Sequence, residues 1–406
     1  MAASDNALRV RAELFSGLIE HLNQSGIRYC ILGGFDRDEA NAGSDIDLMV
    51  DSRELARMPG VMANVAEAAR GKLVQAIWHE TSACYFVLAK RSASYVGFLN
   101  PDCTGDYRRD GRLWLRADDV LSSRCPYRDF YVPSCTDQFI YLFIKRVLKQ
   151  AISPWQLRRL RHLYQRDPRG CRARMSRFFS HATIRQVEKA FSTESGAWFE
   201  AELRGLLTEL RTSPPSEGIV GRAKHFALDV VRVCKRIYSP TGLIVAICGG
   251  RDDLRKELAS RAMAALAPLF RWTRTVSQGP SHRQVPGVAA RMYIRRLRST
   301  LVVATTPGPA QRKPAVLNPD LTVVLRPRNL AAAELIPALE PRGIVYVDPD
   351  EGPENGVDWV TDAVVSILSN RVLSQTNFSR EVLLQPSFES SPSRSGPYML
   401  SSTDGD

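Results

Sequence analysis

Two neighbouring apolar runs near the start of the chain constrain its fold more than any other feature. The first, Tyr29 to Leu32, ends in Gly33-Gly34, and the second, Ile46 to Val50, is preceded by Asp45 and contains Asp47. Because alternate side chains of a strand point to the same face, the two aspartates should open to one side while the residue between them enters the core. Paired carboxylates suit Mg²⁺, which takes the rest of its shell from water and phosphate. The glycines would let a phosphate approach the backbone closely.

The charge balance favours an anionic partner. The 406 residues include 55 lysines and arginines against 43 aspartates and glutamates, which gives a net charge of +12. This length is enough for two or three domains with substantial cores. Such a charge favours nucleotides, nucleic acid, phosphorylated lipid or acidic glycan, and does not choose among them.

The cysteines and the apolar segments predict a cytoplasmic protein. None of the eight cysteines forms a C-x-x-C pair, and several lie in apolar runs, so we expect free buried thiols in a reducing compartment and no zinc site. The six histidines show no metal-ligand spacing and are expected to be structural. The first six residues lack the apolar region of a secretory signal, and no apolar segment approaches membrane-spanning length.

Residues 1–135 predict a mixed sheet with helices. The expected helices are 7–24 and 52–69, the second broken at Pro59-Gly60, and the expected strands are 28–32, 46–50, 73–79, 83–90 and 95–99. Segments 113–121 and 130–132 flank a turn that contains proline. An antiparallel or mixed sheet with helices on one face follows from this order.

Residues 136–238 predict a helical extension with two strongly basic helices, Pro154 to Tyr164 and Val220 to Tyr238. Basic residues interleaved with aromatic ones permit nucleic-acid binding. Each helix also carries an apolar stripe that is expected to pack, so a solvated basic face opposite a buried one is favoured over nucleic-acid binding. These stripes are Leu157, Leu160 and Leu163 on the first helix, and Phe226, Val230 and Val233 on the second.

Residues 239–375 predict a doubly wound α/β domain. Leu243 to Cys248 is a continuous apolar run, typical of a strand buried on both faces in a parallel sheet, and it ends at Gly249-Gly250. Further strands are expected at 301–304, 321–325 and 343–347, with a helix from Asp252 to about 266 and a last helix at 357–368. Residues 376–406 are rich in serine, proline and glycine and are expected to be disordered.

The segment from Tyr29 to Asp51 resembles the nucleotidyltransferase superfamily, in which a Gly-Gly or Gly-Ser turn and an Asp-x-Asp strand hold the incoming nucleotide. The resemblance implies that Gly33, Gly34 and Ser44 meet the phosphates and that Asp45 and Asp47 bind Mg²⁺. It further implies attack of an acceptor hydroxyl on the α-phosphate, with pyrophosphate leaving.

A third carboxylate should complete this metal site, because two-metal catalysis takes several carboxylates. The family places it in an apolar strand after the Asp-x-Asp pair, and here that strand is Tyr95 to Leu99. Asp102 is the first candidate and Asp106 the second. In a further alternative, Asn100 stands at the position where the family has its acidic residue. An Asx turn is the alternative interpretation of Asp102.

Residues 240–370 resemble thymidylate kinase-like P-loop proteins, especially those fused behind nucleotidyltransferase domains in bacterial polysaccharide clusters. The segments Pro240 to Ala246 and Asn318 to Leu325 carry this resemblance. The phosphate-binding loop departs from the family, because the spacing G-x-x-x-x-G-K-[ST] puts Arg255 where the lysine belongs, and Asp252 and Asp253 would repel phosphate. We therefore expect a degenerate domain that keeps the fold without the chemistry.

The sequence thus predicts Mg²⁺-dependent transfer of a nucleotidyl group from an NTP to an unknown hydroxyl or phosphate acceptor, and the resemblance suggests surface polysaccharide synthesis. The first alternative is a non-catalytic scaffold or nucleotide-sensing regulator built from two degenerate nucleotide-binding domains. The second alternative is an active P-loop kinase that uses Arg255.

Overall fold

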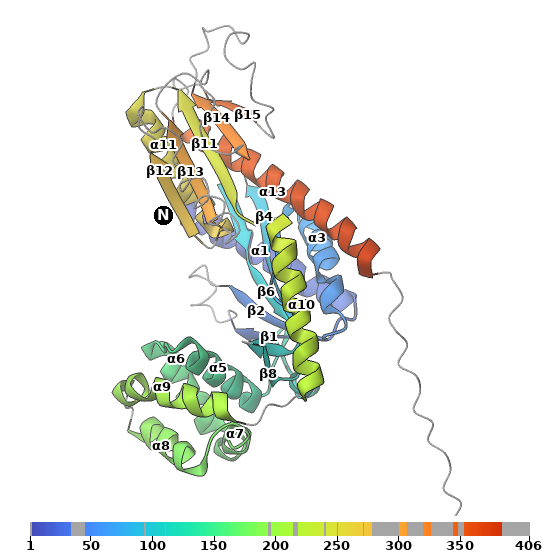
Figure 1. Cartoon of the computed structure of the whole chain (residues 1–406), viewed down its shortest axis with the longest axis vertical. Coiled ribbons are helices and arrows are strands. Elements are labelled where there is room, and N and C mark those ends of the chain that lie inside the picture. Colours follow the sequence, from blue (N-terminus) through green and yellow to red (C-terminus); the bar gives the residue numbers. More distant parts are fainter. Residues whose placement is uncertain are drawn as a thin grey trace, which may run out of the picture.

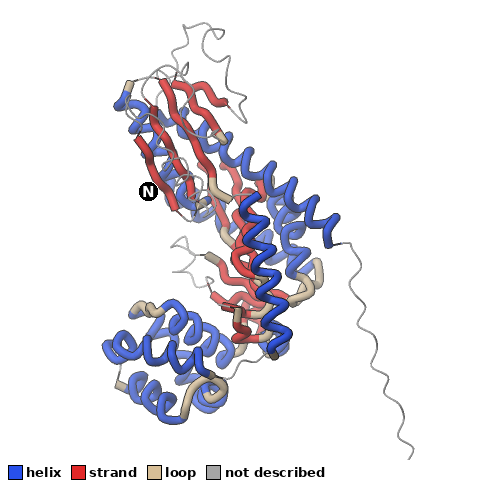
Figure 2. The backbone as a smooth tube through the Cα atoms, in the orientation of Figure 1, coloured by secondary structure: helices blue, strands red, loops and turns tan. Residues whose placement is uncertain are grey.

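A mixed sheet in the middle of the molecule joins an all-helical cluster to a second, parallel sheet (Figure 1). The computed structural model describes residues 2–33, 45–92, 95–109, 111–193, 196–213, 218–238, 241–249, 251–270, 272–277, 300–306, 320–325, 344–347 and 353–383. Figure 2 shows the helical cluster set apart from the two sheets.

The central sheet has the strand order β1-β2-β6-β4-β3, with β5 paired to β4. Strands β2 and β6 run parallel and the other pairs are antiparallel, so the predicted mixed sheet is confirmed. Its elements are α1 (Ala2–Gln24), β1 (Tyr29–Gly33), β2 (Ile46–Val50), η1 (Leu55–Arg57), α3 (Met58–Ala68), β3 (Lys72–Glu80), β4 (Ala83–Ser92), β5 (Tyr95–Leu99) and β6 (Pro101–Thr104).

Pro59 does not break a helix, as the sequence had suggested, but lies in the first turn of α3. Proline is tolerated there because the first backbone N–H groups of a helix have no partner within the helix. The preceding residues form the short η1 instead. The expected segment 113–121 is also divided, into β8 (Arg112–Leu115) and α4 (Ala117–Ser122).

The two faces of the central sheet pack against different parts of the chain. One face, including Ile31, Leu48 and Phe86, packs against α1 and α3. The opposite face divides into two ends. Cys30 and Met49 pack against the helical cluster, whereas Val87 and its neighbours pack against the C-terminal sheet and helices. The middle of this face is therefore left between two attached bodies.

The helical region predicted to begin at residue 136 begins at Cys135, and its first five helices form one cluster. Ser134 caps its first helix: the Ser134 hydroxyl accepts a hydrogen bond from the backbone N–H of Asp137 at 3.2 Å and so satisfies one free donor of the first turn. Its helices are α5 (Cys135–Lys149), α6 (Pro154–Arg166), α7 (Pro168–Met175), α8 (His181–Ser192) and α9 (Gly196–Thr212). Two short hairpins, β7 (Tyr107–Arg109) with β8 and β9 (Cys125–Tyr127) with β10 (Phe130–Val132), precede it.

The C-terminal sheet is wholly parallel, with the order β12-β13-β11-β14-β15. The predicted buried strand, β11, lies at its centre, and β12 is a strand that the sequence had not indicated. Helices α11 and α13 share one hydrophobic cluster with this sheet. The connections that follow β12, β13 and β14 lie largely outside the described residues. The elements are β11 (Leu243–Gly249), α11 (Asp252–Leu266), η2 (Ala267–Leu269), β12 (Trp272–Ser277), β13 (Thr300–Thr306), β14 (Leu321–Leu325), β15 (Ile344–Val347) and α13 (Pro353–Leu383).

Helix α13 ties the C-terminal sheet to the central sheet. Its Arg371 forms an ion pair with the buried carboxylate of Asp320, whose other oxygen accepts from the backbone N–H of Ile244 at 2.8 Å. Its Val372 packs among the residues of α1 and α3. The helix continues to Leu383, beyond the expected boundary at 375, and residues 384–406 lie outside the described part.

All eight cysteines lie in the described part and are free thiols, and five of them are buried. Burial raises the pKa of the Cys30, Cys84 and Cys103 thiols, so these side chains act as small apolar core groups. None of the described helices combines the length and apolar character that a membrane crossing requires.

Candidate active site

A cavity of about 290 Å³ lies over the middle of the central sheet, on the face between the helical cluster and the C-terminal body. Strands β1, β2, β3 and β6 supply its floor, and helices α5 and α6 supply one wall. Its ionisable lining residues are Asp45, Asp47, His79, Glu80, Asp102, Tyr107, Arg109, Tyr141, Lys145, Arg146, Lys149 and Arg159.

The three predicted carboxylates converge in this cavity. Asp47 and Asp102 are direct partners in the parallel pairing of β2 with β6, so their side chains share a face on neighbouring strands. Asp45 lies just before β2 and opens into the same cavity. Gly33 lies beside them, and a β-carbon there would be 3.4 Å from Oδ2 of Asp47. Gly34 and Ser44 lie outside the described residues.

Asp102 is placed here by a strand that the sequence did not reveal. The expected strand 95–99 is β5, which pairs with β4, whereas Asp102 belongs to the separate strand β6 beside β2. Asp102 is therefore a strand residue and not part of an Asx turn. Asn100, just before β6, donates from Nδ2 to the Tyr85 hydroxyl at 2.6 Å.

Asp106, the second candidate, does not line the cavity. Its Oδ1 accepts from the backbone N–H of Ala117 at 2.9 Å, and its Oδ2 lies 3.7 Å from Arg108. These contacts hold the hairpin of β7 and β8 against the start of α4. The structure thus brings Asp102 and not Asp106 to the paired aspartates.

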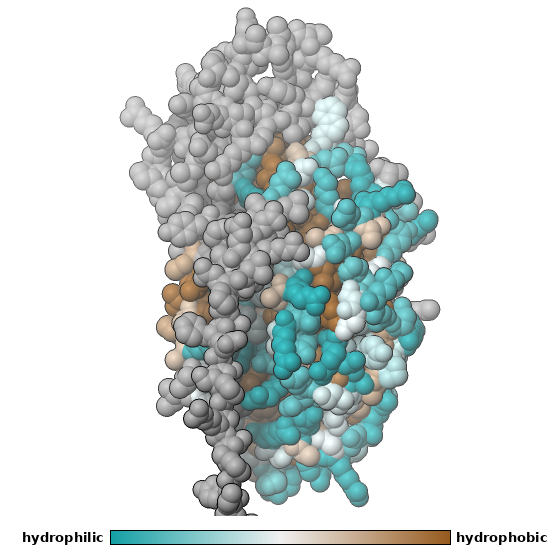
Figure 3. Space-filling model, turned by 90° about the vertical axis from the view of Figure 1, so that its right-hand side faces the viewer, coloured by the Kyte–Doolittle hydropathy of each residue, from teal (hydrophilic) through white to brown (hydrophobic). Residues whose placement is uncertain are grey.

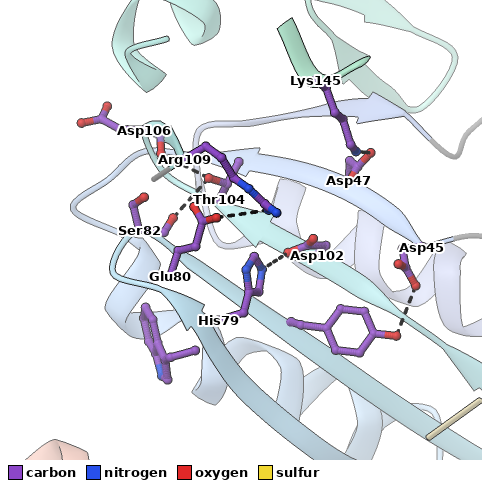
Figure 4. Close-up of polar contacts among 12 residues, drawn as sticks. Asp45, Asp47, His79, Glu80, Ser82, Asp102, Thr104, Asp106, Arg109 and Lys145 are labelled. Carbon is purple, nitrogen blue, oxygen red and sulfur yellow. Dashed lines mark hydrogen bonds and ion pairs between the residues drawn. The ribbon is translucent and has the colours of Figure 1, made fainter. Parts of the chain in front are cut away.

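Each of the three carboxylates has its own partner from another element (Figure 4). Lys145 of α5 forms an ion pair with Asp47, and its Nζ also donates to the Tyr141 hydroxyl at 3.0 Å. His79 of β3 donates from Nε2 to Oδ1 of Asp102 at 2.8 Å. The Tyr85 hydroxyl donates to Oδ1 of Asp45 at 3.2 Å.

These surroundings move the pKa values of two carboxyls in opposite directions. Partial removal from water is the largest cause that raises the pKa of Asp45, and the charges of Asp102 and Asp47 add to it, although the residue stays exposed at the cavity mouth. Burial alone would also raise the pKa of Asp102. The hydrogen bond and charge of His79, with Lys145 and Lys149, outweigh this effect and lower it.

Several lining residues were missed or misread from the sequence. His79 was not among the predicted site residues, but it lines the cavity and forms a hydrogen bond with Asp102. The solvated basic face expected for the helix at 154–164 includes Arg159, which lines the cavity. Tyr141, Lys145 and Lys149 recur at intervals of four in α5 and so share one helix face. That spacing could have indicated a common surface, but not the sheet that the surface faces.

The second Gly-Gly turn has a different character. Gly249 ends the central strand β11, and Gly250 lies outside the described residues. Arg255 is buried and its Nη2 pairs with Asp252 at 3.0 Å, while Asp253 pairs with Arg251. Because Arg255 is drawn into the body of the domain, the arrangement speaks against its use as a substitute for a phosphate-binding lysine.

Within the described ranges, no group of three or more histidine, cysteine, aspartate and glutamate side chains is arranged tightly enough to hold a metal ion. Lys145 and His79 occupy oxygens of two of the three cavity carboxylates. Compared with models of known protein families and with curated proteins, the sequence matches none.

Proposed function

We propose that the cavity transfers a nucleotidyl group from an NTP to a hydroxyl or phosphate acceptor, with Mg²⁺ as cofactor. The observation that carries the proposal is the convergence of Asp45, Asp47 and Asp102 beside Gly33. Mg²⁺ binds proteins through one or two carboxylates and takes its other ligands from water and phosphate, so the carboxylates of two adjoining strands need not form a closed group of three to hold it. A cation between them is favoured by the same neighbouring charges that raise the pKa of Asp45. When bound, Mg²⁺ would supply charge stabilisation at the phosphoryl oxygens.

The cationic wall supports the same proposal. Lys145, Lys149, Arg109 and Arg159 surround the carboxylates, so one cavity contains groups for a metal ion and groups for a polyphosphate. Lysine and arginine N–H groups form charge-assisted hydrogen bonds with phosphate oxygens. Burial, followed by the charges of Lys145 and Arg146, lowers the pKa of Lys149, which is consistent with cations crowded at one wall. We propose that Lys145 leaves Asp47 when the nucleotide binds and then donates a hydrogen bond to one of its phosphate oxygens.

The likeness of residues 29–51 to nucleotidyltransferases is part of this proposal, as is a setting in surface polysaccharide synthesis, which rests on the resemblance alone. The C-terminal body is proposed to be a degenerate thymidylate kinase-like domain. Two observations support degeneracy: Asp252 and Asp253 occupy the first turn of α11, and Arg255 is buried.

The deciding experiment neutralises the paired carboxylates without changing their size. Asp45→Asn with Asp47→Asn should reduce transfer of an α-phosphate radiolabel from NTP to acceptors in a cell extract to background. The matched control, Asp118→Asn with Asp119→Asn, removes two exposed carboxylates of α4 outside the cavity and should leave transfer unchanged. Circular dichroism confirms folding of both. Wild-type transfer by the folded cavity variant would overturn the proposal.

The pairing of Asp47 with Lys145 and of Asp102 with His79 favours one other function, a non-catalytic scaffold or nucleotide sensor. Protein cations already neutralise these carboxylates, as in a site retained for binding or for structure. Calorimetric titration with Mg²⁺ and each NTP separates the two cases. Saturable binding with no detectable transfer, together with full rescue of a deletion phenotype by the double variant, would support the scaffold.

A further inference from the structure

Helix α10 (Ile219–Tyr238) meets the rest of the protein with its polar side. Its His225 lies 3.4 Å from the Thr81 hydroxyl, and its Arg232 donates to the backbone carbonyl of Trp78 at 3.4 Å. Arg232 also pairs with Asp229 of the same helix. His225, Asp229 and Arg232 are half-buried against the β3 end of the central sheet.

The apolar side of α10 faces solvent, contrary to the packed stripe expected from its sequence. Five of the nine large apolar side chains that are exposed in the described part belong to this one helix. Their exposed fractions are 72% for Phe226, 44% for Leu228, 47% for Val230, 52% for Val231 and 48% for Val233. An amphipathic helix of a globular protein normally turns this stripe to the core.

The figures place this helix on an open side of the molecule. In Figure 1 α10 lies in front of the central sheet. Figure 3 is turned by 90° relative to Figure 1, so the side that faces the viewer in Figure 1 lies along the left-hand edge of Figure 3. Apolar residues reach the surface along this edge. Contiguous exposed apolar surface of this kind marks a binding site for a protein or a membrane.

Charge selects between these partners. Helix α10 carries five basic residues, Arg222, Lys224, Arg232, Lys235 and Arg236, and one acidic residue, Asp229, within a chain of net charge +12. We propose that α10 docks the protein onto an anionic lipid bilayer, with Phe226, Val230 and Val233 entering the interface. Strongly amphipathic helices with basic residues among their polar positions lie in the plane of the membrane surface, and nearby lysines attract anionic headgroups.

The outward side chains are less suited to nucleic acid. A nucleic-acid surface presents arginine, lysine and stacking aromatic groups outward. Here the outward positions hold mostly aliphatic side chains, and Arg232 is turned toward β3. The docking helix is also close to the cavity in the fold, because His225 contacts Thr81, the residue after the cavity-lining Glu80.

The test uses the full chain and vesicles of phosphatidylcholine, either alone or with about one third phosphatidylglycerol. The protein should sediment with the anionic vesicles, and added salt should weaken this binding. Phe226→Ser with Val230→Ser should weaken binding at least tenfold. Trp359→Ser, which alters an exposed apolar residue of α13, should leave it unchanged. Both changes are at exposed positions, and circular dichroism verifies folding.

Four results would overturn the proposal. The first is absence of binding to anionic vesicles by the wild type, and the second is equal binding by the α10 double variant. The third is a wild-type dimer, seen by light scattering, that does not form in the double variant, together with absence of lipid binding. The apolar face would then join two copies of this chain. A Lys224→Gln variant serves as a second probe and should weaken binding only to the anionic vesicles. DNA binding that Lys224→Gln weakens and Phe226→Ser does not would likewise favour nucleic acid over lipid.

Discussion

Asp102 of β6 lies directly opposite Asp47 of β2 in a parallel strand pair, yet the two carboxylates are held by opposite sides of the cavity. Lys145 reaches Asp47 from the helical cluster, and His79 reaches Asp102 from β3. The site therefore depends on elements separated by about a hundred residues in the chain. The register of β2 against β6 decides whether the carboxylates of Asp47 and Asp102 lie side by side.

The position of Asp102 predicts a sharp difference from Asp106. Asp102→Asn should lower nucleotidyl transfer by a factor on the order of a hundred or more, because an electrostatic contact to the reacting groups is typically worth that much. Asp106→Asn should retain transfer, since its amide oxygen can still accept from Ala117. Steady-state assays of the two variants, with thermal unfolding as the folding check, test this. Equal losses would contradict the assignment of Asp102.

The lowered pKa of Asp102 predicts a pH-dependent contribution to stability. A carboxyl with a folded-state pKa below its unfolded value of about 3.9 stabilises the protein above that pH, and this contribution is lost as the pH falls through the folded pKa. The stability difference between wild type and Asp102→Asn should therefore be present at pH 7 and shrink below about pH 4. Thermal unfolding across this range measures it. A difference that grows on acidification would have the wrong sign.

Lys145 should matter more for function than for folding. Lys145→Met keeps much of the stem but leaves Asp47 without its ion pair, and we expect a loss of about 1–3 kcal/mol because the pair is only partly buried. Nucleotide affinity should fall at least tenfold. As a control, Arg9→Met removes an exposed, solvent-screened ion pair with Glu13 and should leave stability almost unchanged. Unchanged nucleotide affinity in Lys145→Met would refute its phosphate role.

The Asp320–Arg371 pair predicts which contact fixes α13. Asp320→Ala should destabilise the protein by about 3–5 kcal/mol, because it leaves Arg371 and the Ile244 N–H without their shared acceptor. Asp253→Ala breaks an exposed, solvent-screened ion pair with Arg251 and should leave stability almost unchanged. Urea unfolding of both variants gives the comparison. Similar small losses would show that α13 is held by its apolar contacts alone.

Local sequence patterns determined most strands, the helical cluster and the shared side of Asp45 and Asp47. Alternation along β2 and the unbroken apolar run of β11 reflect burial of a strand on one or two faces, and such burial is written into neighbouring residues. The parallel direction of the C-terminal strands was predicted on the same grounds, whereas their order in the sheet was not. Pro59 was misread because the effect of a proline depends on whether it lies in the first turn of a helix or in its interior. Strand β12 was missed because a short strand also depends on its pairing with a neighbouring strand.

Only the tertiary structure decided which distant groups meet at the site and which way each helix turns. Nothing local distinguishes Lys145 or His79 from a surface lysine or a structural histidine, since their partners come from other strands. The amphipathic pattern of α10 correctly defines two faces, but polar contacts with Thr81 and Trp78 turn its apolar face outward. Periodicity fixes which residues share a face, whereas the neighbour of that face depends on long-range packing.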